Sequence, residues 1–270
     1  MICFPNAKIN LGLHITEKRS DGFHNIETVF YKVGWQDALE ILPSAKETSF
    51  NLHLSGIPIT GNLTDNLLYK AYQLITAIKP VPAVDVYLHK HIPMGAGLGG
   101  GSADAAFFIN LLNEQFALNL SEHEKLTVAK KLGSDCAFFI NNTPVFAFEK
   151  GDVFEPVQLD LSKYWIAVIY PNVHSNTAEA YALVKPQLPD KSIKQILQQP
   201  IATWKDELLN DFEASICSIY PIVKQIKETL YAQGALYACM SGSGSAVFGI
   251  FEKEPILIGM ETFPKWIGKM

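Results

Sequence analysis

Cysteine is scarce in this sequence, and its four copies lie far apart. Cys3, Cys136, Cys217 and Cys239 form no close pair, so their spacing excludes a zinc knuckle and a CxxC redox motif. At 270 residues the chain is also too long for the small scaffolds that depend on disulfides. We therefore expect reduced thiols that are mostly buried.

Long hydrophobic runs are missing as well. No apolar run approaches the roughly 18 residues that a membrane-spanning helix requires. The first residues, MICFPNAKIN, lack the charged start and the continuous apolar region of a secretion signal. We predict a cytoplasmic protein that does not associate with a membrane.

The chain has no excess of basic residues. Its 22 Lys and Arg residues stand against 27 Asp and Glu residues, which gives a net charge of −5 and a pI near 5.8. A nucleic-acid-binding protein is therefore not expected, and a polyanionic ligand would have to be held by locally placed groups. With 48% hydrophobic and 18% charged residues, the composition is that of a folded globular protein. It indicates no oligomeric state.

The first third of the chain predicts strands followed by a helix. Apolar residues alternate over residues 9–15 and again over 26–33, which indicates a hairpin. Over residues 67–78 they recur at helical spacing, with Thr64 or Asp65 placed to cap the helix.

The middle of the chain predicts a strand, a glycine loop and two helices. Residues 83–88 alternate as a strand and lead into a glycine cluster, after which residues 103–112 have an apolar helical pattern. Ser121 and Glu124 have the spacing of a capping box for a helix that ends near residue 132.

A domain boundary is expected near residues 150–165, where the composition changes before a new apolar strand at 165–170. We divide the chain into an amino-terminal domain, residues 1–155, and a carboxy-terminal domain, residues 156–270. Strands and helices follow one another irregularly, which favours an α+β fold over a doubly wound parallel sheet. Helical patterns in the second half cover residues 177–185, 191–198 and 221–233.

The segment between the expected strand and helix has five glycines in eleven residues. It comprises Pro93, Met94, Gly95, Ala96, Gly97, Leu98, Gly99, Gly100, Gly101, Ser102 and Ala103. Glycines let backbone N–H groups approach phosphate oxygens, and a following helix adds partial positive charge. The alternative is a tight connection without a ligand. The loop lacks the Lys-Ser/Thr ending of a Walker A motif and does not open a first βαβ unit as a dinucleotide fingerprint would.

Residues 93–102 follow the pattern Pro-x-x-x-Gly-Leu-Gly-x-x-Ser and resemble the ATP loop of the GHMP kinase superfamily. Residues 132–135 and 240–245 resemble further motifs of that superfamily, and residues 5–11 resemble part of the amino-terminal signature of one member; all occur in the family order. Within residues 18–24, the element Arg-x-Asp-Gly-Phe-His resembles the member that phosphorylates a cytidine diphosphate-linked polyol.

The resemblance implies a two-domain α+β GHMP kinase fold with an ATP and substrate cleft between the domains. It implies ATP and a cytidine diphosphate-linked polyol as small-molecule substrates, and Mg²⁺ is expected with the nucleotide, although no Asp/Glu cluster identifies its protein ligands. The amino-terminal domain would carry the ATP loop and two catalytic residues, Lys8 and Asp135. The carboxylate would accept or orient the substrate hydroxyl proton, and the ammonium would stabilise the developing charge.

Each catalytic candidate has a purely structural alternative. Lys8 lies within an apolar strand pattern, where a lysine is more often exposed at a sheet edge. Asp135 follows Gly-Ser and is equally typical of a helix cap or a turn.

The resemblance also implies binding residues. Lys90 and Asn66 would contact ATP beside the loop, although a surface lysine and a capping asparagine are the common alternatives. Phe23, His24 and Tyr181 would hold the cytosine, against the alternative of ordinary core rings. Asn10 and Gly242 would lie near the substrate.

Departures from the family pattern occur at Asn6, at Phe23, where tyrosine is frequent, and at Cys136-Ala137. They affect only fine geometry around Asp135 and a hydrogen bond that a tyrosine hydroxyl would make from position 23. Two competing interpretations remain: another GHMP kinase, acting on a mevalonate derivative, homoserine or a sugar, and a nucleotide-binding module without catalysis.

Overall fold

The computed structural model describes residues 1–45 and 49–270. These residues divide into two compact units, and the residues of each unit mainly contact one another. Unit 1 comprises Met1–Ala7, Trp35–Pro93 and Gly99–Asn142, and unit 2 comprises Lys8–Gly34, Met94–Leu98 and Thr143–Met270. This division differs from the boundary expected at residues 155/156, because residues 8–34 and 94–98 group with the second half of the chain.

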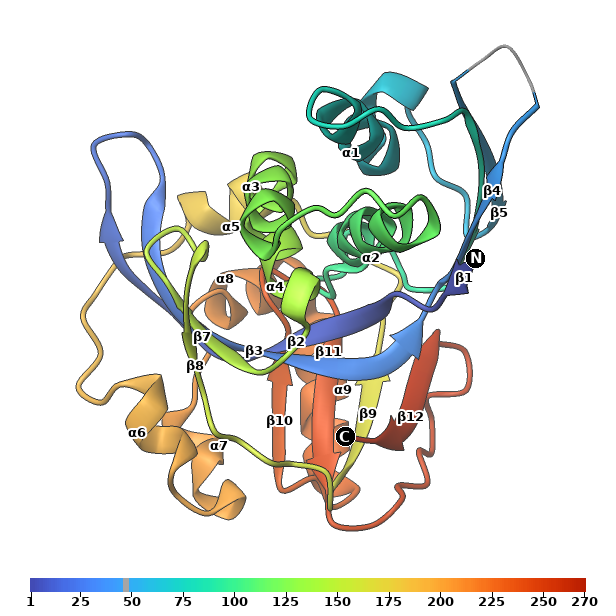
Figure 1. The fold of residues 1–270 in the computed structure, drawn as a ribbon. Helices are drawn as coiled ribbons and strands as arrows, with labels where there is room; N and C mark the ends of the chain where they lie inside the picture. Colours follow the sequence, from blue (N-terminus) through green and yellow to red (C-terminus); the bar gives the residue numbers. More distant parts are fainter. Residues whose placement is uncertain (46–48) are drawn as a thin grey trace. The chain divides into compact units, whose positions relative to one another are not determined.

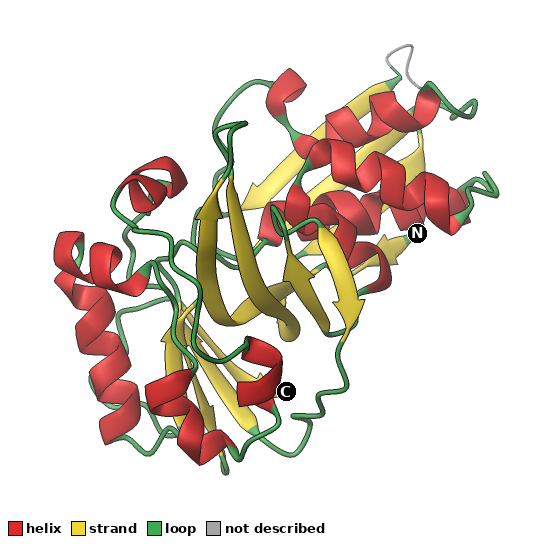
Figure 2. Cartoon of the chain, turned by 90° about the vertical axis from the view of Figure 1, so that its left-hand side faces the viewer, coloured by secondary structure: helices red, strands yellow, loops and turns green. Residues whose placement is uncertain are grey.

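Unit 1 is built on a four-stranded sheet with the strand order β1-β4-β6-β5. The pairs β1–β4 and β4–β6 are antiparallel, whereas β5 and β6 are parallel. The strands are β1 (Ile2–Cys3), β4 (Ala38–Pro43), β5 (Phe50–Gly56) and β6 (Val84–Lys90), and the helices are α1 (Leu67–Thr76), α2 (Gly100–Gln115), α3 (Glu122–Leu132) and α4 (Ser134–Asn141). Figures 1 and 2 show the helices gathered on one face of this sheet.

Alternation along β6 explains which face the helices cover. Val84, Val86 and Leu88 are buried, whereas Tyr87 and His89, which alternate with them, are exposed. Successive side chains of a strand point to opposite faces, so one face of the sheet packs against helices and the other faces solvent. Lys90 continues the buried series.

The helix ends of unit 1 confirm one predicted cap and correct another. Ser121 accepts a hydrogen bond from the backbone of Glu124, and the Glu124 carboxylate accepts one in return, so the predicted capping box is present and α3 ends at Leu132. Helix α1, in contrast, is capped by Asn66, whose side chain accepts from the N–H of Leu68 at 2.9 Å. The predicted caps Thr64 and Asp65 instead belong to a preceding 3₁₀ turn, Leu63–Asp65.

Unit 2 contains two four-stranded sheets. The first has the order β2-β3-β7-β8 and includes the predicted hairpin, while the second has the order β10-β11-β9-β12 and is antiparallel throughout. The strands are β2 (Asn6–Lys18), β3 (His24–Gln36), β7 (Val145–Phe148), β8 (Val153–Pro156), β9 (Trp165–Ile169), β10 (Tyr237–Met240), β11 (Val247–Phe251) and β12 (Lys265–Lys269). The first two residues of β2 and the last two of β3 belong to unit 1.

The helices of unit 2 complete a mixed fold. They are α5 (Thr177–Ala182), α6 (Ile193–Leu197), α7 (Trp204–Glu207), α8 (Glu213–Ile219) and α9 (Pro221–Ala232). Helix α9 packs on β10 and β11 through Val223, Ile226 and Leu230, which are buried in the core of this unit (Figure 1). The combination of sheets with separate helices confirms the predicted α+β class.

Two expectations from composition concern cysteines and membranes. Cys3, Cys136, Cys217 and Cys239 are all free thiols, and Cys136 and Cys239 are buried. Among residues 1–45 and 49–270, no helix is long and apolar enough to cross a membrane.

Candidate functional site

Lys8 lies on β2 and is buried, with only 3% of its surface exposed. Its Nζ donates a hydrogen bond of 2.7 Å to Oδ1 of Asn10 and lies 5.0 Å from the centre of the Phe30 ring. A buried ammonium is costly unless polar groups satisfy it. The alternative of an exposed edge lysine is therefore wrong. The surroundings of Lys8 provide an acceptor and an aromatic ring for its ammonium.

The first part of the glycine segment, residues 94–98, packs on the turn after β10. The hydroxyl of Ser241 donates to the carbonyl oxygen of Gly97 at 2.8 Å, and the N–H of Ala246 donates to the carbonyl oxygen of Ala96 at 3.0 Å. The N–H of Lys8 donates to the carbonyl oxygen of Leu98 at 2.9 Å. These bonds join the predicted ATP loop, the predicted carboxy-terminal glycine motif and the strand of Lys8 within one unit.

Two glycines permit this close packing. Gly97 has φ +76°, and a Cβ there would stand 1.9 Å from the carbonyl oxygen of Ser241. Gly242 has φ +56°, and its Cβ would stand 3.3 Å from Oδ1 of Asn10 and from the carbonyl oxygen of Gly97. Both positions thus favour glycine for backbone conformation, and Gly97 also needs it for space. The predicted residues Asn10, Gly97 and Gly242 lie together.

The second part of the segment, residues 99–103, begins helix α2. The predicted start was near residue 103, but Gly99 adopts φ 69° and serves as the N-cap, so α2 begins at Gly100. Since glycine has no side chain, no side chain caps the first turn of this helix. The N–H groups and dipole at the end of a 16-residue helix favour an anion.

Gly100 and Gly101 are adjacent but differ in their surroundings. A Cβ at Gly100 would stand 2.9 Å from Cγ2 of Ile92 and 2.9 Å from Nζ of Lys90. At Gly101, which is exposed, the nearest atom to such a Cβ would be Cδ1 of Leu67 at 4.0 Å. Gly100 is therefore required by protein packing, whereas the space beside Gly101 is open.

Lys90 is not on the surface. It is 2% exposed, and its Nζ lies 2.5 Å from Oδ2 of Asp37 and 2.8 Å from Oδ2 of Asp104. Asp37 also accepts hydrogen bonds from the N–H groups of His91 and Ile92, at 2.6 and 2.8 Å. The ion-paired triad of Lys90, Asp37 and Asp104 therefore ties the end of β6 to α2 and holds the chain that enters the glycine segment.

The triad has two carboxylates for one ammonium. Burial raises the pKa of Asp104 to about 7, and the nearby charge of Asp37 adds to this rise while Lys90 opposes it. Burial by itself would lower the pKa of Lys90, but the two carboxylates raise it overall. Lys90 is thus charged at neutral pH. An ATP contact by its side chain stays a prediction, as does one by Asn66, whose role as a helix cap is confirmed.

Asp135 is the second residue of α4, after Gly133 as the N-cap and Ser134. It is half-buried in the first helical turn, where the helix dipole stabilises a carboxylate. The next residues, Cys136 and Ala137, are buried in the same helix, so this departure from the family pattern is accommodated as helix core. Burial raises the pKa of the Cys136 thiol to about 11.

The residues predicted to hold a base differ in exposure. The rings of His24 and Tyr181 are stacked, with centroids 4.8 Å apart, and Tyr181 meets Phe212 edge to face. Phe23 is 61% exposed, with Nζ of Lys150 lying 5.3 Å from its ring centre. Burial, followed by the charge of Lys18, lowers the pKa of His24. A neutral imidazole can donate one hydrogen bond and accept another.

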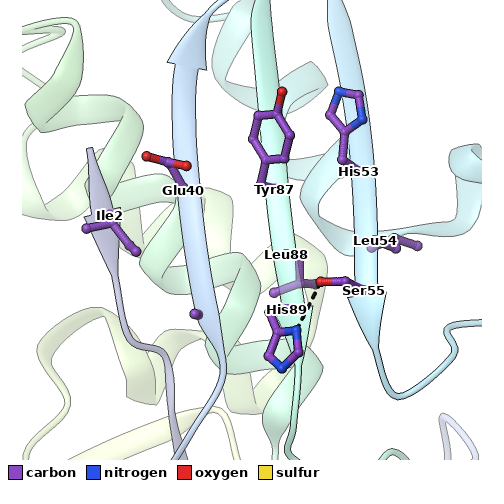
Figure 3. Close-up of a pocket in the computed structure, with 9 residues that line it drawn as sticks. Ile2, Glu40, His53, Leu54, Ser55, Tyr87, Leu88 and His89 are labelled. Atoms are coloured by element: carbon purple, nitrogen blue, oxygen red, sulfur yellow. Dashed lines mark hydrogen bonds between the residues drawn. The ribbon is translucent and has the colours of Figure 1, made fainter.

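A separate hollow of about 270 Å³ lies on the solvent-facing side of the sheet in unit 1 (Figure 3). Glu40, Tyr87 and His53 lie side by side across three strands, and the rings of His53 and Tyr87 are stacked with centroids 4.4 Å apart. None of the predicted site residues lines it. Within the described parts of the chain, no group of three or more His, Cys, Asp or Glu residues could hold a metal ion.

Two sequence models of one protein family match the chain. The model of the GHMP kinases N terminal domain matches residues 66–143, and the model of the GHMP kinases C terminal domain matches residues 192–257. The first match includes the glycine segment and Asp135, and the second includes Ser241 and Gly242.

Relatives and a solved structure extend the similarity over nearly the whole chain. The chain is 54% identical over 264 residues to the 4-diphosphocytidyl-2-C-methyl-D-erythritol kinase of Cytophaga hutchinsonii (97% of this chain, 95% of the relative). It is 51% identical over 262 residues to the kinase of the same name from Bacteroides fragilis (97% and 96%). A crystal structure of 4-(cytidine 5'-diphospho)-2C-methyl-D-erythritol kinase superposes with a TM-score of 0.79 at 30% identity (93% and 90%).

Proposed function

Because this chain belongs to the GHMP kinase family, we propose that it phosphorylates 4-diphosphocytidyl-2-C-methyl-D-erythritol with ATP. The γ-phosphoryl group passes to the 2-hydroxyl, giving the 2-phosphate and ADP in the non-mevalonate route to isoprenoid precursors. The observation that carries this proposal is the identity of 51–54% to two kinases of that name over 97% of the chain. This identity favours the cytidine substrate over the competing GHMP substrates, which are mevalonate derivatives, homoserine and sugars. The cytoplasmic location stays a prediction from the sequence.

ATP would bind at the first turn of α2. The uncapped N–H groups of that turn and the open space beside Gly101 support phosphate binding at this point. The triad of Lys90, Asp37 and Asp104 supports the same segment from within the protein. Packing of Gly97 on Ser241 fixes the neighbouring part of the loop.

Asp135 and Lys8 would serve the transfer itself. A carboxylate can accept the proton of the attacking hydroxyl, and an ammonium can stabilise the negative charge that develops on the transferring group. The buried, hydrogen-bonded setting of Lys8 supports a positioned charge. Retention of both residues argues against a nucleotide-binding module without catalysis.

Phe23, His24 and Tyr181 would recognise the cytosine ring. The exposed ring of Phe23 and the stacked pair of His24 and Tyr181 offer flat surfaces for a base. Since the pKa of His24 is lowered, its imidazole is neutral near pH 7 and can bond to both donor and acceptor atoms of cytosine.

Mg²⁺ would arrive with the ATP phosphates and neutralise part of their charge. At such sites phosphate oxygens and water commonly supply most of its ligands, together with one or two carboxylates. We assign it no protein ligand.

The test is ADP release by the purified full-length chain, with and without Mg²⁺, on a panel of alcohols. We expect Mg²⁺-dependent turnover of 4-diphosphocytidyl-2-C-methyl-D-erythritol and a new phosphomonoester on its 2-oxygen in the ³¹P NMR spectrum. Mevalonate, homoserine and galactose should give no comparable turnover. Faster turnover of one of these three would replace the proposed substrate, and ATP binding without any turnover would favour the non-catalytic module.

A further inference from the structure

The side-chain amide of Asn10 is held at both ends: its Nδ2 faces the Thr28 hydroxyl, and its Oδ1 faces the Lys8 ammonium, with Oγ of Ser241 3.4 Å away. The Thr28 hydroxyl donates its one proton to the carbonyl oxygen of Gly12, at 2.6 Å. Its oxygen can then only accept, and the group beside it, at 2.9 Å, is Nδ2 of Asn10. The other end of the amide, Oδ1, therefore faces Nζ of Lys8, at 2.7 Å.

Because these residues are buried, the orientation of the Asn10 amide matters for the Lys8 ammonium. Thr28 is 0% exposed, Asn10 2% and Lys8 3%, so water has little access to replace a lost partner. An ammonium can only donate. If the amide of Asn10 turned over, its NH₂ group would face the ammonium, and two donors would oppose each other in a low-dielectric setting.

The acceptor for the Thr28 proton is itself fixed by the backbone. Gly12 lies within β2 with φ +67°, and a Cβ there would stand 2.7 Å from Cδ1 of Leu208. Leu13, the next residue, donates its N–H to the carbonyl oxygen of Leu209 at 2.9 Å. The Gly12 carbonyl thus belongs to a packed part of unit 2 and orients the Thr28 hydroxyl.

We infer that Thr28 is a positioning residue for phosphoryl transfer: its hydroxyl orients Asn10 so that an oxygen holds the ammonium of Lys8 in place. This inference rests on the proposed function, because it assigns Lys8 to the transfer step. Thr28 itself touches Asn10 and Gly12 and acts only through them.

The test compares Thr28→Val, which keeps the shape and removes the hydroxyl, with Thr28→Ser, which keeps the hydroxyl. We expect Thr28→Val to lower kcat on the order of 10-fold or more, with KM for ATP changed by less than about 3-fold, since the ammonium acts mainly as charge develops. Thr28→Ser should retain kcat within about 3-fold. If Thr28→Val folds poorly, Thr28→Cys keeps a similar volume with a much weaker hydrogen-bonding group and takes its place.

A double variant shows whether Thr28 acts through Lys8. In a Lys8→Met background, Thr28→Val should cause no further loss of kcat, because the group that it positions is gone. Thr229→Val, which removes a hydroxyl bonded to the carbonyl oxygen of Gln225 on an exposed helix face, is the matched control and should leave kcat unchanged. Equal kcat in Thr28→Val and wild type, or a full additional loss in the Lys8→Met background, overturns the inference.

A spectroscopic measurement separates this inference from the proposed function. In protein carrying ¹³Cε-lysine, the Lys8 resonance is identified by its absence in Lys8→Met. Its chemical shift should change in Thr28→Val and return in Thr28→Ser, whatever the substrate of the enzyme proves to be. An unchanged Lys8 resonance in Thr28→Val overturns the positioning role. If wild type does not turn over the cytidine substrate but the Lys8 shift still changes in Thr28→Val, only the proposed function is overturned.

Discussion

The hydroxyl of Ser241 donates to the carbonyl oxygen of Gly97, 144 residues earlier in the chain, across a contact that leaves no room for a β-carbon. A methyl group at residue 97 would meet the backbone of Ser241 rather than a side chain that can move aside. The predicted ATP loop and the predicted carboxy-terminal motif therefore constrain each other through their backbones.

Gly97→Ala should destabilise the protein. The new Cβ would stand 1.9 Å from the carbonyl oxygen of Ser241, at a φ of +76°, so overpacking and backbone strain should together lower the free energy of unfolding by about 2–4 kcal/mol. Urea unfolding followed by circular dichroism measures this. A free energy of unfolding equal to that of wild type would contradict the tight contact.

Gly101→Val should weaken ATP binding without loss of stability. The position is open and helical, with no neighbouring atom closer than 4.0 Å to a new Cβ, so a side chain there would occupy only the space proposed for phosphate. We expect ATP affinity to fall by about 10-fold or more, while affinity for the cytidine substrate is kept. Calorimetric titration with each ligand measures both. Gly100→Val is the poorer probe, because its side chain would strike Ile92 and Lys90.

Asp135→Asn should slow the chemical step. The amide keeps the size of the carboxylate and removes its charge, so kcat should fall by a factor on the order of 10²–10⁴. The KM for ATP and the KM for the cytidine substrate should change little. Lys8→Met should also lower kcat, and the double variant should be scarcely slower than the worse single one. Asp160→Asn, at an exposed turn, is the control. Near-wild-type turnover in folded Asp135→Asn would remove this residue from the catalytic assignment.

His24→Phe should relax the choice of base. Phenylalanine preserves a flat ring against Tyr181 and removes the hydrogen-bonding nitrogens. The loss of transition-state stabilisation should be about 1–3 kcal/mol, which lowers kcat/KM for the cytidine substrate roughly 5- to 150-fold. Wild type should strongly prefer the cytidine substrate over its uridine analogue, and His24→Phe should narrow that preference. An unchanged ratio of the two kcat/KM values would show that His24 does not recognise the base.

The stability of the protein should depend on pH through Asp104. Its pKa rises from 3.8 to about 7 in the folded protein, so between these values the folded chain holds a proton that the unfolded chain has lost. The free energy of unfolding should therefore fall as pH rises from about 4 to about 7. In Asp104→Asn the side chain at position 104 stays uncharged at every pH. This variant should therefore show a smaller fall in urea midpoint than wild type between pH 5 and pH 8. Equal falls in both proteins would contradict a protonated Asp104.

Much of the fold could be predicted from the sequence because it is encoded locally. The alternation over residues 9–15 and 26–33 gives β2 and β3, and the capping box at Ser121 gives the start of α3. The predicted caps of α1, Thr64 and Asp65, lie one or two residues before the observed cap, Asn66, since all three are good capping residues. Asn66 is distinguished by its extended backbone and by the hydrogen bond that its side chain accepts from Leu68, and composition reveals neither.

The surroundings of the charged residues could be predicted less well. The alternation Val84, Val86, Leu88 places Lys90 on the buried face of β6, and a lysine on such a face needs an anionic partner. That pattern contained the signal that Lys90 is internal. Its partners Asp37 and Asp104, 53 residues before it and 14 after it, depend on tertiary packing, and no local pattern identifies them. The role of Thr28 likewise becomes visible only when β2 and β3 are paired.

The burial of Cys136 bears on how this enzyme can be chemically modified. With a pKa of about 11, the thiol next to Asp135 is ionised in only about one molecule in 10⁴ at pH 7, and Cys136 is fully buried. Alkylating and oxidising reagents act on the thiolate, so they should spare this cysteine in the folded protein. A covalent inhibitor directed at the proposed transfer site must therefore react with a group other than the cysteine adjacent to it.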